Sequence, residues 1–245
     1  YKKEKIVIKC GGKVLIDPYL FNIFIEDVAI LYKLGLTIVI VHGGGPRIKI
    51  ELAKLNIESQ FINGLRVTDK QSMEIVEKAL VDFNSEIIEK LEKKECKAGG
   101  LNVSHNNIFI VEQESKNLGF VGRPKKILNE KIQTIIDQQK IPVISPMGKD
   151  EEEKKYNINA DTAAAAIAKS LKSRRLLLMT DVAGVYDKDK NLINEIKPAD
   201  AKNLIDKRIV EGGMIPKLLN SIDAIENGVK GVVIIDGRKL HSILY

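Results

Sequence analysis

Short runs of valine, isoleucine and leucine alternate along this chain with longer stretches in which apolar residues recur every three or four positions. The short runs are typical of β-strands buried on both faces, and the longer stretches are typical of amphipathic helices. The runs predict strands at 6–8, 37–41, 108–111, 142–145, 176–180 and 232–235. The periodic stretches predict helices near 19–34, 47–55, 69–94, 129–139, 160–172, 199–206 and 217–227.

Local signals support the predicted helix ends. Gly35 follows the last periodic residue of helix 19–34, at a position where a glycine in the left-handed conformation commonly ends a helix. Thr68 and Gln71 have the spacing of a capping box at the start of helix 69–94.

The alternation of strands and helices, with strands that are apolar throughout, predicts an α/β fold: a three-layer αβα sandwich around a mostly parallel central sheet. A length of 245 residues suits one large unit or two lobes that share the sheet. The stretch 96–121 interrupts the alternation, because Asn, Ser and Gly surround its apolar runs, and it predicts a hairpin or lid. The charged run 149–155 predicts an exposed loop.

Charge and composition narrow the classes of partner. The formal net charge is +6, but the lysines alternate with acidic residues, as in 92–95, and aromatic residues make up only 5%. A nucleic-acid binder should gather its basic residues on one face, so solvated helix faces explain the charge better. No apolar run reaches the roughly 18 residues of a membrane-spanning helix. We therefore expect neither nucleic acid nor a membrane as a partner.

The cysteines and histidines predict no metal site. Cys10 and Cys96 have neither disulfide nor metal-ligand spacing, and the three histidines share no spacing. Reduced thiols are typical of a cytoplasmic protein, which is the location we expect. The chain begins with Tyr1 rather than Met and soon enters an apolar run, so we expect that preceding residues are missing.

A run of three glycines follows the second predicted strand. Strand 37–41 leads into His42-Gly43-Gly44-Gly45-Pro46, and a helix comes next. Backbone N–H groups of glycines can turn toward an anion at the start of a helix, so the loop predicts an anion site. It is not a Walker A loop, because no Lys-Ser or Lys-Thr follows at the required spacing. A plain structural turn is the alternative.

Three charged residues lie beside glycines or helix starts. Lys9 ends the first strand before Gly11-Gly12, and Lys217 follows Gly212-Gly213 at the start of a helix, where the helix dipole disfavours a cation. Asp161 comes just before an alanine-rich helix. Two lysines held by a carboxylate suit phosphoryl transfer, which depends on positioning and charge neutralisation. An exposed strand-end lysine and an ordinary first-turn carboxylate are the alternatives for Lys9 and Asp161.

Two further segments suit binding of a carboxylate and of a nucleotide. Arg66 precedes helix 69–94, and its guanidinium can hold a carboxylate through two parallel hydrogen bonds, with a surface salt bridge as the alternative. The loop 180–186 follows strand 176–180, and ligands of open α/β sheets gather at the carboxyl ends of strands. Together with the lysines, these residues predict phosphoryl transfer onto a small acidic molecule.

The order and spacing of these motifs resemble the amino-acid kinase superfamily and, within it, the acetylglutamate kinase family. The resemblance covers essentially all 245 residues. The motifs that carry it are Lys9-Cys10-Gly11-Gly12, 41–46, 64–69, 118–122, 156–161, 180–184, 212–217 and Ile235-Asp236-Gly237-Arg238. It implies the amino-acid kinase fold. An N-terminal lobe, 1–172, would carry the acidic substrate and the dimer contact, and a C-terminal lobe, 173–245, would carry ATP.

The resemblance implies ATP-dependent phosphorylation of the side-chain carboxylate of N-acetyl-L-glutamate in arginine biosynthesis, with Mg²⁺ accompanying ATP. The implied catalytic residues are Lys9, Lys217 and Asp161. The implied substrate-binding residues are Gly44, Gly45, Arg66, Asn157 and Asn159. The implied nucleotide-binding residues are Gly11, Gly12, Thr180, Asp181, Val182, Gly184, Val185, Tyr186, Gly212, Gly213 and Met214.

The resemblance also implies a homo-oligomer, a dimer or a hexameric ring of dimers, and arginine as an allosteric inhibitor. The segment 102–107 departs from the family's pattern, because it reads Asn-Val-Ser-His-Asn-Asn where a Gly-Lys-Asp-type segment is common. Three rival functions stay open. They are a sibling kinase acting on carrier-bound or N-blocked aminoadipate in lysine biosynthesis, a non-catalytic arginine-sensing module and, on charge alone, a nucleic-acid binder.

Overall fold

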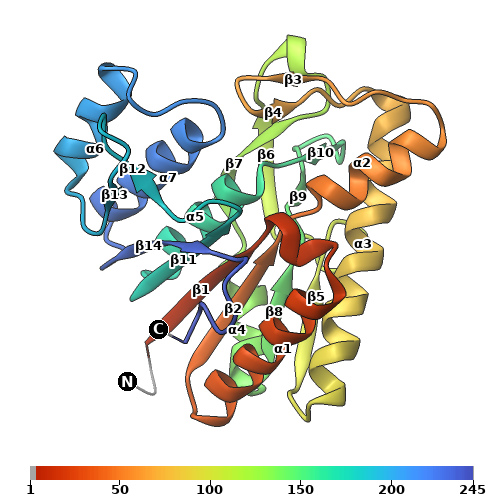
Figure 1. Ribbon diagram of the computed structural model, residues 1–245. Helices are drawn as coiled ribbons and strands as arrows, with labels where there is room; N and C mark the ends of the chain where they lie inside the picture. Colours follow the sequence, from red (N-terminus) through yellow and green to blue (C-terminus); the bar gives the residue numbers. More distant parts are fainter. Residues whose placement is uncertain (1–3, 245) are drawn as a thin grey trace.

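The computed structural model describes residues 4–244, and a sheet of six strands forms its centre (Figure 1). Every pair of neighbouring strands in this sheet is parallel, and the spatial order is β14-β11-β1-β2-β8-β5. The strands are β1 (Lys5–Cys10), β2 (Thr37–His42), β5 (Ala98–Leu101), β8 (Ile141–Ile144), β11 (Arg175–Thr180) and β14 (Val232–Asp236). The prediction that residues precede Tyr1 lies outside the described residues.

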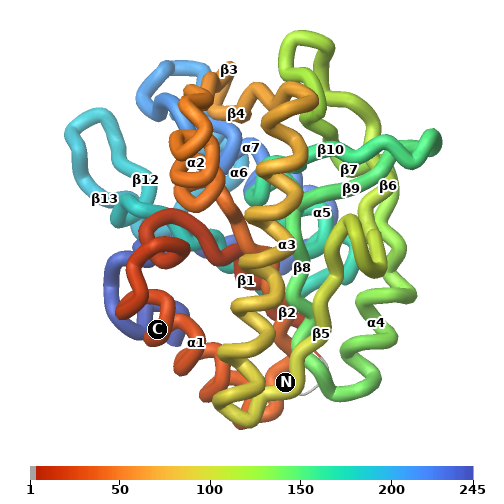
Figure 2. Tube along the Cα trace, turned by 90° about the vertical axis from the view of Figure 1, so that its right-hand side faces the viewer, coloured from red at the N-terminus to blue at the C-terminus, as the bar shows by residue number. Residues whose placement is uncertain are grey.

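Helices cover both faces of the sheet. On one face lie α1 (Pro18–Lys33) and α3 (Lys70–Lys93), which cross in front of the strands in Figure 2. On the other lie α4 (Asn129–Asp137), α5 (Ala160–Ser170) and α7 (Met214–Glu226). At the rims, α2 (Gly45–Lys54) packs against α3, and α6 (Pro198–Asp206) packs against α7.

Alternate residues of the central strands supply the two cores. In β2, Ile38 and Ile40 pack with α1 and α3, whereas Val39 and Val41 pack with α5. Successive side chains of a strand point to opposite faces, so a strand buried on both faces must be apolar at every position. The predicted three-layer αβα sandwich is confirmed.

A second sheet and two hairpins complete the fold. The second sheet has the order β10-β9-β6-β7, with β6 (Phe109–Gln113), β7 (Gly122–Ile127), β9 (Met147–Lys149) and β10 (Lys155–Asn157). The hairpins pair β3 (Phe61–Ile62) with β4 (Leu65–Arg66) and β12 (Val185–Tyr186) with β13 (Leu192–Ile193). Two short 3₁₀ turns are η1 (Gly12–Leu15) and η2 (Lys116–Leu118).

Most predicted elements lie close to their predicted bounds. Five predicted strands belong to the central sheet, strand 108–111 is β6 of the second sheet, and the seven helices are α1 to α7. Gly35 ends α1 as predicted, with a φ of +82° and an N–H that donates to a carbonyl of the last turn at 2.9 Å. The predicted capping box is wrong. Asp69 rather than Thr68 caps α3, and its carboxylate accepts the Ser72 N–H at 2.7 Å.

The stretch 96–121 is only partly the predicted hairpin. Its second half supplies β6, which pairs with β7, but its first half forms β5 at the edge of the central sheet, parallel to β8. β5 is hard to predict from the sequence because it contains Gly99 and Gly100, and glycine is depleted in strands. Close packing explains them, because a Cβ at Gly99 would lie 3.1 Å from Ile135 and one at Gly100 would lie 2.7 Å from Asn84 Oδ1.

The remaining expectations concern the surface and the two lobes. The run 149–155 is a largely exposed turn that joins β9 to β10, as predicted. None of the helices within residues 4–244 combines the length and the apolarity that crossing a membrane requires. The division into lobes at residue 172 stays a prediction, and β1 and β11, on either side of it, are paired neighbours in one sheet.

Candidate active site

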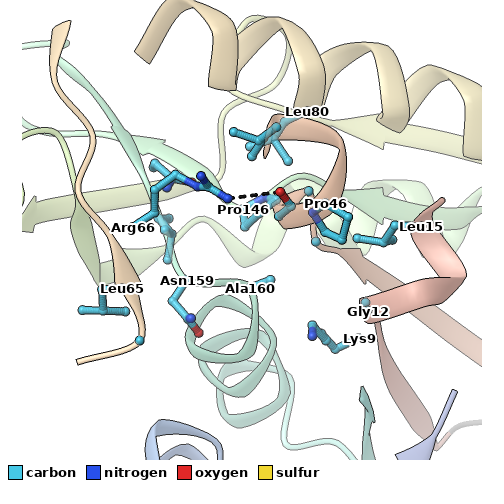
Figure 3. Close-up of a pocket in the computed structure, with 18 of the residues that line it drawn as sticks. Lys9, Gly12, Leu15, Pro46, Leu65, Arg66, Leu80, Pro146, Asn159 and Ala160 are labelled. Atoms are coloured by element: carbon cyan, nitrogen blue, oxygen red, sulfur yellow. Dashed lines mark hydrogen bonds between the residues drawn. The ribbon is translucent and has the colours of Figure 1, made fainter. Parts of the chain in front are cut away.

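Two cavities adjoin the carboxyl ends of the neighbouring strands β1, β2 and β11, and both are lined by Lys9 and Gly12. The first, which we call the β2 cavity, has a volume of about 230 Å³ and lies between the glycine loop after β2, the β3–β4 hairpin and the start of α5 (Figure 3). The second, the β11 cavity, has a volume of about 440 Å³ and lies between the loop after β11 and the start of α7.

Three buried charged side chains lie where the two cavities meet. Asp161 Oδ1 is 3.0 Å from Lys9 Nζ, and Asp161 Oδ2 is 2.6 Å from Lys217 Nζ. The three residues expose only 9% (Lys9), 9% (Asp161) and 5% (Lys217) of their surface. Two ammonium groups and one carboxylate leave one unbalanced positive charge in a place with little water. The cluster therefore favours the arrival of an anion.

The pKa values of the cluster reflect this balance. Burial by itself would raise the pKa of Asp161, but the Lys9 and Lys217 ammonium groups outweigh it and hold that pKa below its ordinary value. Burial lowers the pKa of Lys217, and the Lys9 charge adds to this lowering, while Asp161 and, more weakly, Asp181 oppose it. Lys217 is thus a cation whose charged form an arriving anion would stabilise.

The start of α5 sets the position of Asp161. Asn159 is the N-cap of this helix, and its Oδ1 accepts the N–H groups of Asp161 and Thr162, both at 3.0 Å. A side-chain oxygen at this position satisfies backbone donors that have no partner within the helix. Asp161 then lies in the first turn, where a negative charge is favourable. Lys217 lies in the first turn of α7, where its charge is unfavourable unless Asp161 compensates it.

The two glycines after β1 leave room for charged side chains. A Cβ at Gly11 would overlap the Lys9 ammonium, and a Cβ at Gly12 would overlap the Asp181 carboxylate. Gly12 also has a φ of +68°, which residues with a Cβ rarely adopt. Because this space is open, the Lys13 N–H can donate to Asp181 Oδ1 at 2.6 Å. The loop after β1 is thereby tied to the loop after β11.

Arg66 is a buried cation that has no acidic partner among residues 4–244. Its guanidinium donates to the Gly45 carbonyl at 3.1 Å and to Ser59 Oγ, and it lies 4.8 Å from the centroid of the Phe61 ring. Burial lowers the pKa of Arg66. Figure 3 shows Arg66 on the opposite side of the β2 cavity from Lys9. An unpaired guanidinium in this position is suited to hold a carboxylate.

Behind the glycine loop, the fully buried His42 belongs to a chain of hydrogen bonds. Its Nδ1 lies 3.0 Å from the Gly43 carbonyl oxygen, and its Nε2 lies 3.2 Å from Asn84 Nδ2, which also donates to the Val143 carbonyl at 3.0 Å. Burial lowers the pKa of His42 to about 4, so the imidazole is neutral at neutral pH. Because a carbonyl only accepts hydrogen bonds, the single ring proton is on Nδ1.

Most of the predicted site residues come together at the two cavities. Those lining the β2 cavity are Lys9, Gly11, Gly12, Gly44, Gly45, Arg66, Asn157 and Asn159. Those lining the β11 cavity are Lys9, Gly12, Thr180, Asp181, Val182, Gly213, Met214 and Lys217. Asp161 lies between them, in contact with both lysines.

Four predicted nucleotide-binding residues line neither cavity. Gly184 and Val185 border a separate cavity of about 440 Å³ between the β12–β13 hairpin, α6 and α7. Tyr186 is exposed in β12, and Gly212 lies in the turn before α7. The chain leaves the central sheet at Thr180, where β11 ends, and Gly184, whose φ is +155°, directly precedes the hairpin. Contact of these four residues with a nucleotide stays a prediction.

Sequence reasoning missed several residues of the site. Phe61 and Leu65 line the β2 cavity from the β3–β4 hairpin, and Asn63-Gly64, which forms its turn with φ values of 49° and 80°, is a strong hairpin signal that would have revealed it. Glu211 lines the β11 cavity, and nothing in its sequence context marks it. The role of His42 behind the loop requires the fold, because Asn84 and Val143 are far from it in the sequence.

Known proteins are similar to this chain in sequence and in structure. A sequence model of the amino acid kinase family matches residues 4–236. The acetylglutamate kinase of Pelagibacter ubique strain HTCC1062 is 55% identical over 245 residues, covering 100% of this chain and 85% of that protein. The acetylglutamate kinase of Brucella anthropi is 42% identical over 258 aligned residues, covering 100% of this chain and 87% of that protein. A crystal structure of smu.665 from Streptococcus mutans UA159 has a TM-score of 0.85 and 30% identity, covering 94% of each chain.

The low pKa of His42 predicts a specific loss of stability in acid. Unfolding restores an ordinary pKa near 6.5, so the unfolded chain binds the extra proton first, and the free energy of unfolding falls as the pH drops from about 6.5 toward 4. We expect His42 to contribute roughly 2–3 kcal/mol of this fall by pH 4.5. Urea unfolding at several pH values measures it.

The matched comparison uses two variants. In His42→Asn the acid-dependent fall should shrink by that amount, whereas His105→Asn, which changes an exposed histidine, should behave like the wild-type protein. Equal falls in wild type and His42→Asn would contradict a buried neutral imidazole.

Proposed function

The chain belongs to the amino acid kinase family, and we propose that it transfers the γ-phosphoryl group of ATP to the side-chain carboxylate of N-acetyl-L-glutamate. The products would be N-acetyl-L-glutamyl 5-phosphate and ADP, in a step of arginine biosynthesis. The observation that carries the proposal is the position of the Lys9–Asp161–Lys217 cluster, which has an excess positive charge, between two cavities.

The β2 cavity suits a small acceptor that carries two carboxylates. Arg66 has a free cationic charge for one of them, and Lys9 lies across the cavity near the other. Asn159 uses its Oδ1 to cap α5, which leaves its amide N–H₂ group to donate to an acetyl or carboxyl oxygen. Asn157 also lines the cavity from the end of β10.

The β11 cavity suits the phosphates of ATP. It is lined by Lys9, Lys217 and the glycines of two loops. No cluster of three or more His, Cys, Asp or Glu side chains that could hold a metal exists within residues 4–244. Mg²⁺ would therefore arrive as part of the substrate Mg-ATP, bound mainly through phosphate oxygens. Asp181 and Glu211 are the carboxylates that line this cavity and could take part in holding it.

The reaction then needs positioning and charge more than proton transfer. A carboxylate oxygen of the acceptor attacks the γ-phosphorus, the bond from that phosphorus to the β–γ bridging oxygen breaks, and ADP leaves. The attacking carboxylate is already deprotonated, so no general base is required. Lys9 and Lys217 would neutralise the charge on the transferring group, and Asp161 would hold both lysines in place.

From the same resemblance we also propose a homo-oligomeric state, inhibition by arginine and a cytoplasmic location. The rival sensor function would not require two lysines held by one buried carboxylate, so the cluster supports catalysis over it.

Measurement of ADP release with different acceptors tests the proposal. We expect turnover of Mg-ATP with N-acetyl-L-glutamate and at least about 10²-fold less with N-acetyl-aminoadipate, whose extra methylene displaces the reacting carboxylate by about 1 Å. Glutamate lacks the acetyl group and should also be a poor acceptor. A preference for the aminoadipate compound would favour the lysine-pathway sibling, and no turnover with any acceptor would favour the sensor.

Replacement of a lysine tests the proposed roles in the cluster. Lys217→Met preserves much of the side-chain volume but removes the excess positive charge, and we expect kcat to fall by about 10²–10³-fold while the protein stays folded. Lys202→Met, which changes an exposed lysine on α6 in the same half of the chain, is the matched control and should keep full activity. Full activity in Lys217→Met would remove that lysine from the mechanism.

A further inference from the structure

A buried row of hydrogen-bonded polar groups behind the glycine loop has no role in the phosphoryl transfer described above. It consists of His42, Asn84 and the Val143 carbonyl, and it connects β2 with α3 and β8. Its residues lie beneath the loop Gly43 to Gly45 and line neither cavity. These three hydrogen-bonded groups therefore cannot touch a substrate in the β2 cavity directly.

This arrangement is poorly explained by packing alone. Asn84 Oδ1 is buried without a hydrogen-bond partner, which costs stability, and the Gly100 backbone has to lie close to it. The ring of Phe83 meets the imidazole edge-on at a centroid distance of 5.2 Å, so an apolar side chain would fit these surroundings. A polar pair at this position implies a task that an apolar pair could not perform.

The task concerns the direction of one peptide group. The Gly43 N–H donates to the Cys10 carbonyl at 2.7 Å, and the Gly43 carbonyl accepts from His42 Nδ1 at 3.0 Å. Both polar groups of Gly43 are thus held in the protein interior. In a trans peptide the C=O and the next N–H point in opposite directions, so the Gly44 N–H points away from the imidazole, and Gly44 itself lines the β2 cavity.

The Gly44 N–H has no acceptor in the described part of the chain. Neither does the N–H of Gly45, which is the first residue of α2 and carries the partial positive charge of a helix start. A Cβ at Gly45 would meet no protein atom within 4 Å, so the space beside it is open. Two donors without an acceptor thus belong to residues that line the cavity in which the reacting carboxylate would lie.

We propose that His42 is a positioning residue for phosphoryl transfer: by holding the Gly43 carbonyl, it aims the Gly44 N–H at the reacting carboxylate or the transferring phosphoryl group. The inference rests on the proposed function, because it assigns a role within that same site. Asn84 completes the arrangement, since its donation to Nε2 leaves Nδ1 as the protonated nitrogen. Without the imidazole donor, the Gly43 peptide loses the bond that fixes its orientation.

Two substitutions at His42 separate positioning from packing. His42→Leu removes the donor while keeping an apolar filling, whereas His42→Asn keeps an N–H₂ group on Cγ, where Nδ1 is attached. We expect kcat to fall by about 10²-fold in His42→Leu, the loss typical of one misplaced backbone donor, and to recover to within about tenfold of wild type in His42→Asn. The KM for ATP should change by no more than about twofold in either variant. His105→Leu, at an exposed histidine, is the matched control.

The decisive result is whether His42→Asn recovers the kcat that His42→Leu loses. Recovery in His42→Asn but not in His42→Leu, with folded protein in both cases, supports positioning. Equal kcat values in the two variants, or a His42→Leu kcat within about twofold of wild type, would overturn it. If His42→Leu fails to fold, His42→Gln replaces it in this comparison. The glutamine amide nitrogen lies one bond farther from Cγ than Nδ1 does, on the side of Asn84.

A second measurement separates this inference from the proposed function. Nitrogen-15 NMR of His42 in the ligand-free wild-type protein reports the tautomer without any substrate, and we expect a neutral ring protonated on Nδ1. A ring protonated on Nε2 would overturn the inference whatever the acceptor proves to be. Absence of turnover in the wild-type protein, with the Nδ1 tautomer present, would instead count against the proposed function.

Discussion

One carboxylate, that of Asp161, is shared by two lysines in a place with little water, and the rest of the site depends on this interaction. Its oxygens lie 3.0 Å from Lys9 Nζ and 2.6 Å from Lys217 Nζ. Either lysine alone would balance the carboxylate, so the second one leaves an unmet positive charge. Such a charge is costly to bury and is stabilised when an anion binds. The fold thus maintains a place that favours a phosphoryl group before the group arrives.

The surrounding sequence follows from the need to bring these charges together. The strands β1 and β11 are parallel neighbours, so Lys9 and Thr180 lie together at the carboxyl ends of the strands. The capped start of α5 places Asp161 at the same end of the sheet. The glycines after β1 leave the space that the charged side chains occupy, since a Cβ at Gly11 would overlap the Lys9 ammonium. The glycines of the loop after β1 are therefore required by the neighbouring charged side chains as well as by the approach of an anion.

Much of this could be predicted from the sequence, because strands buried on both faces and glycine loops after strands have local signatures. Two local features were also misjudged, the cap of α3 and the Asn63-Gly64 turn, but features determined by distant neighbours have no local signature. β5 was missed because Gly99 and Gly100 are there to accommodate Ile135 and Asn84, which are far away in the chain. Local signals mark Lys9, Asp161 and Lys217 and suggest two lysines held by one carboxylate, but they leave ordinary roles for Lys9 and Asp161 open, and only the family resemblance removes these alternatives. The partners of His42 could not be predicted, since nothing local links it to Asn84.

The central claim is that the cluster carries a positive charge that an anion must balance, and the pKa of Lys217 tests it most directly. Carbon-13 NMR of the lysine Cε atoms can follow the titration of this ammonium group in the free protein and in the complex with a non-hydrolysable ATP analogue, Mg²⁺ and N-acetyl-L-glutamate. The account predicts a pKa below the ordinary value of 10.5 in the free protein, caused by burial and by Lys9, and a clear rise in the complex. An ordinary pKa that does not change on binding would contradict it.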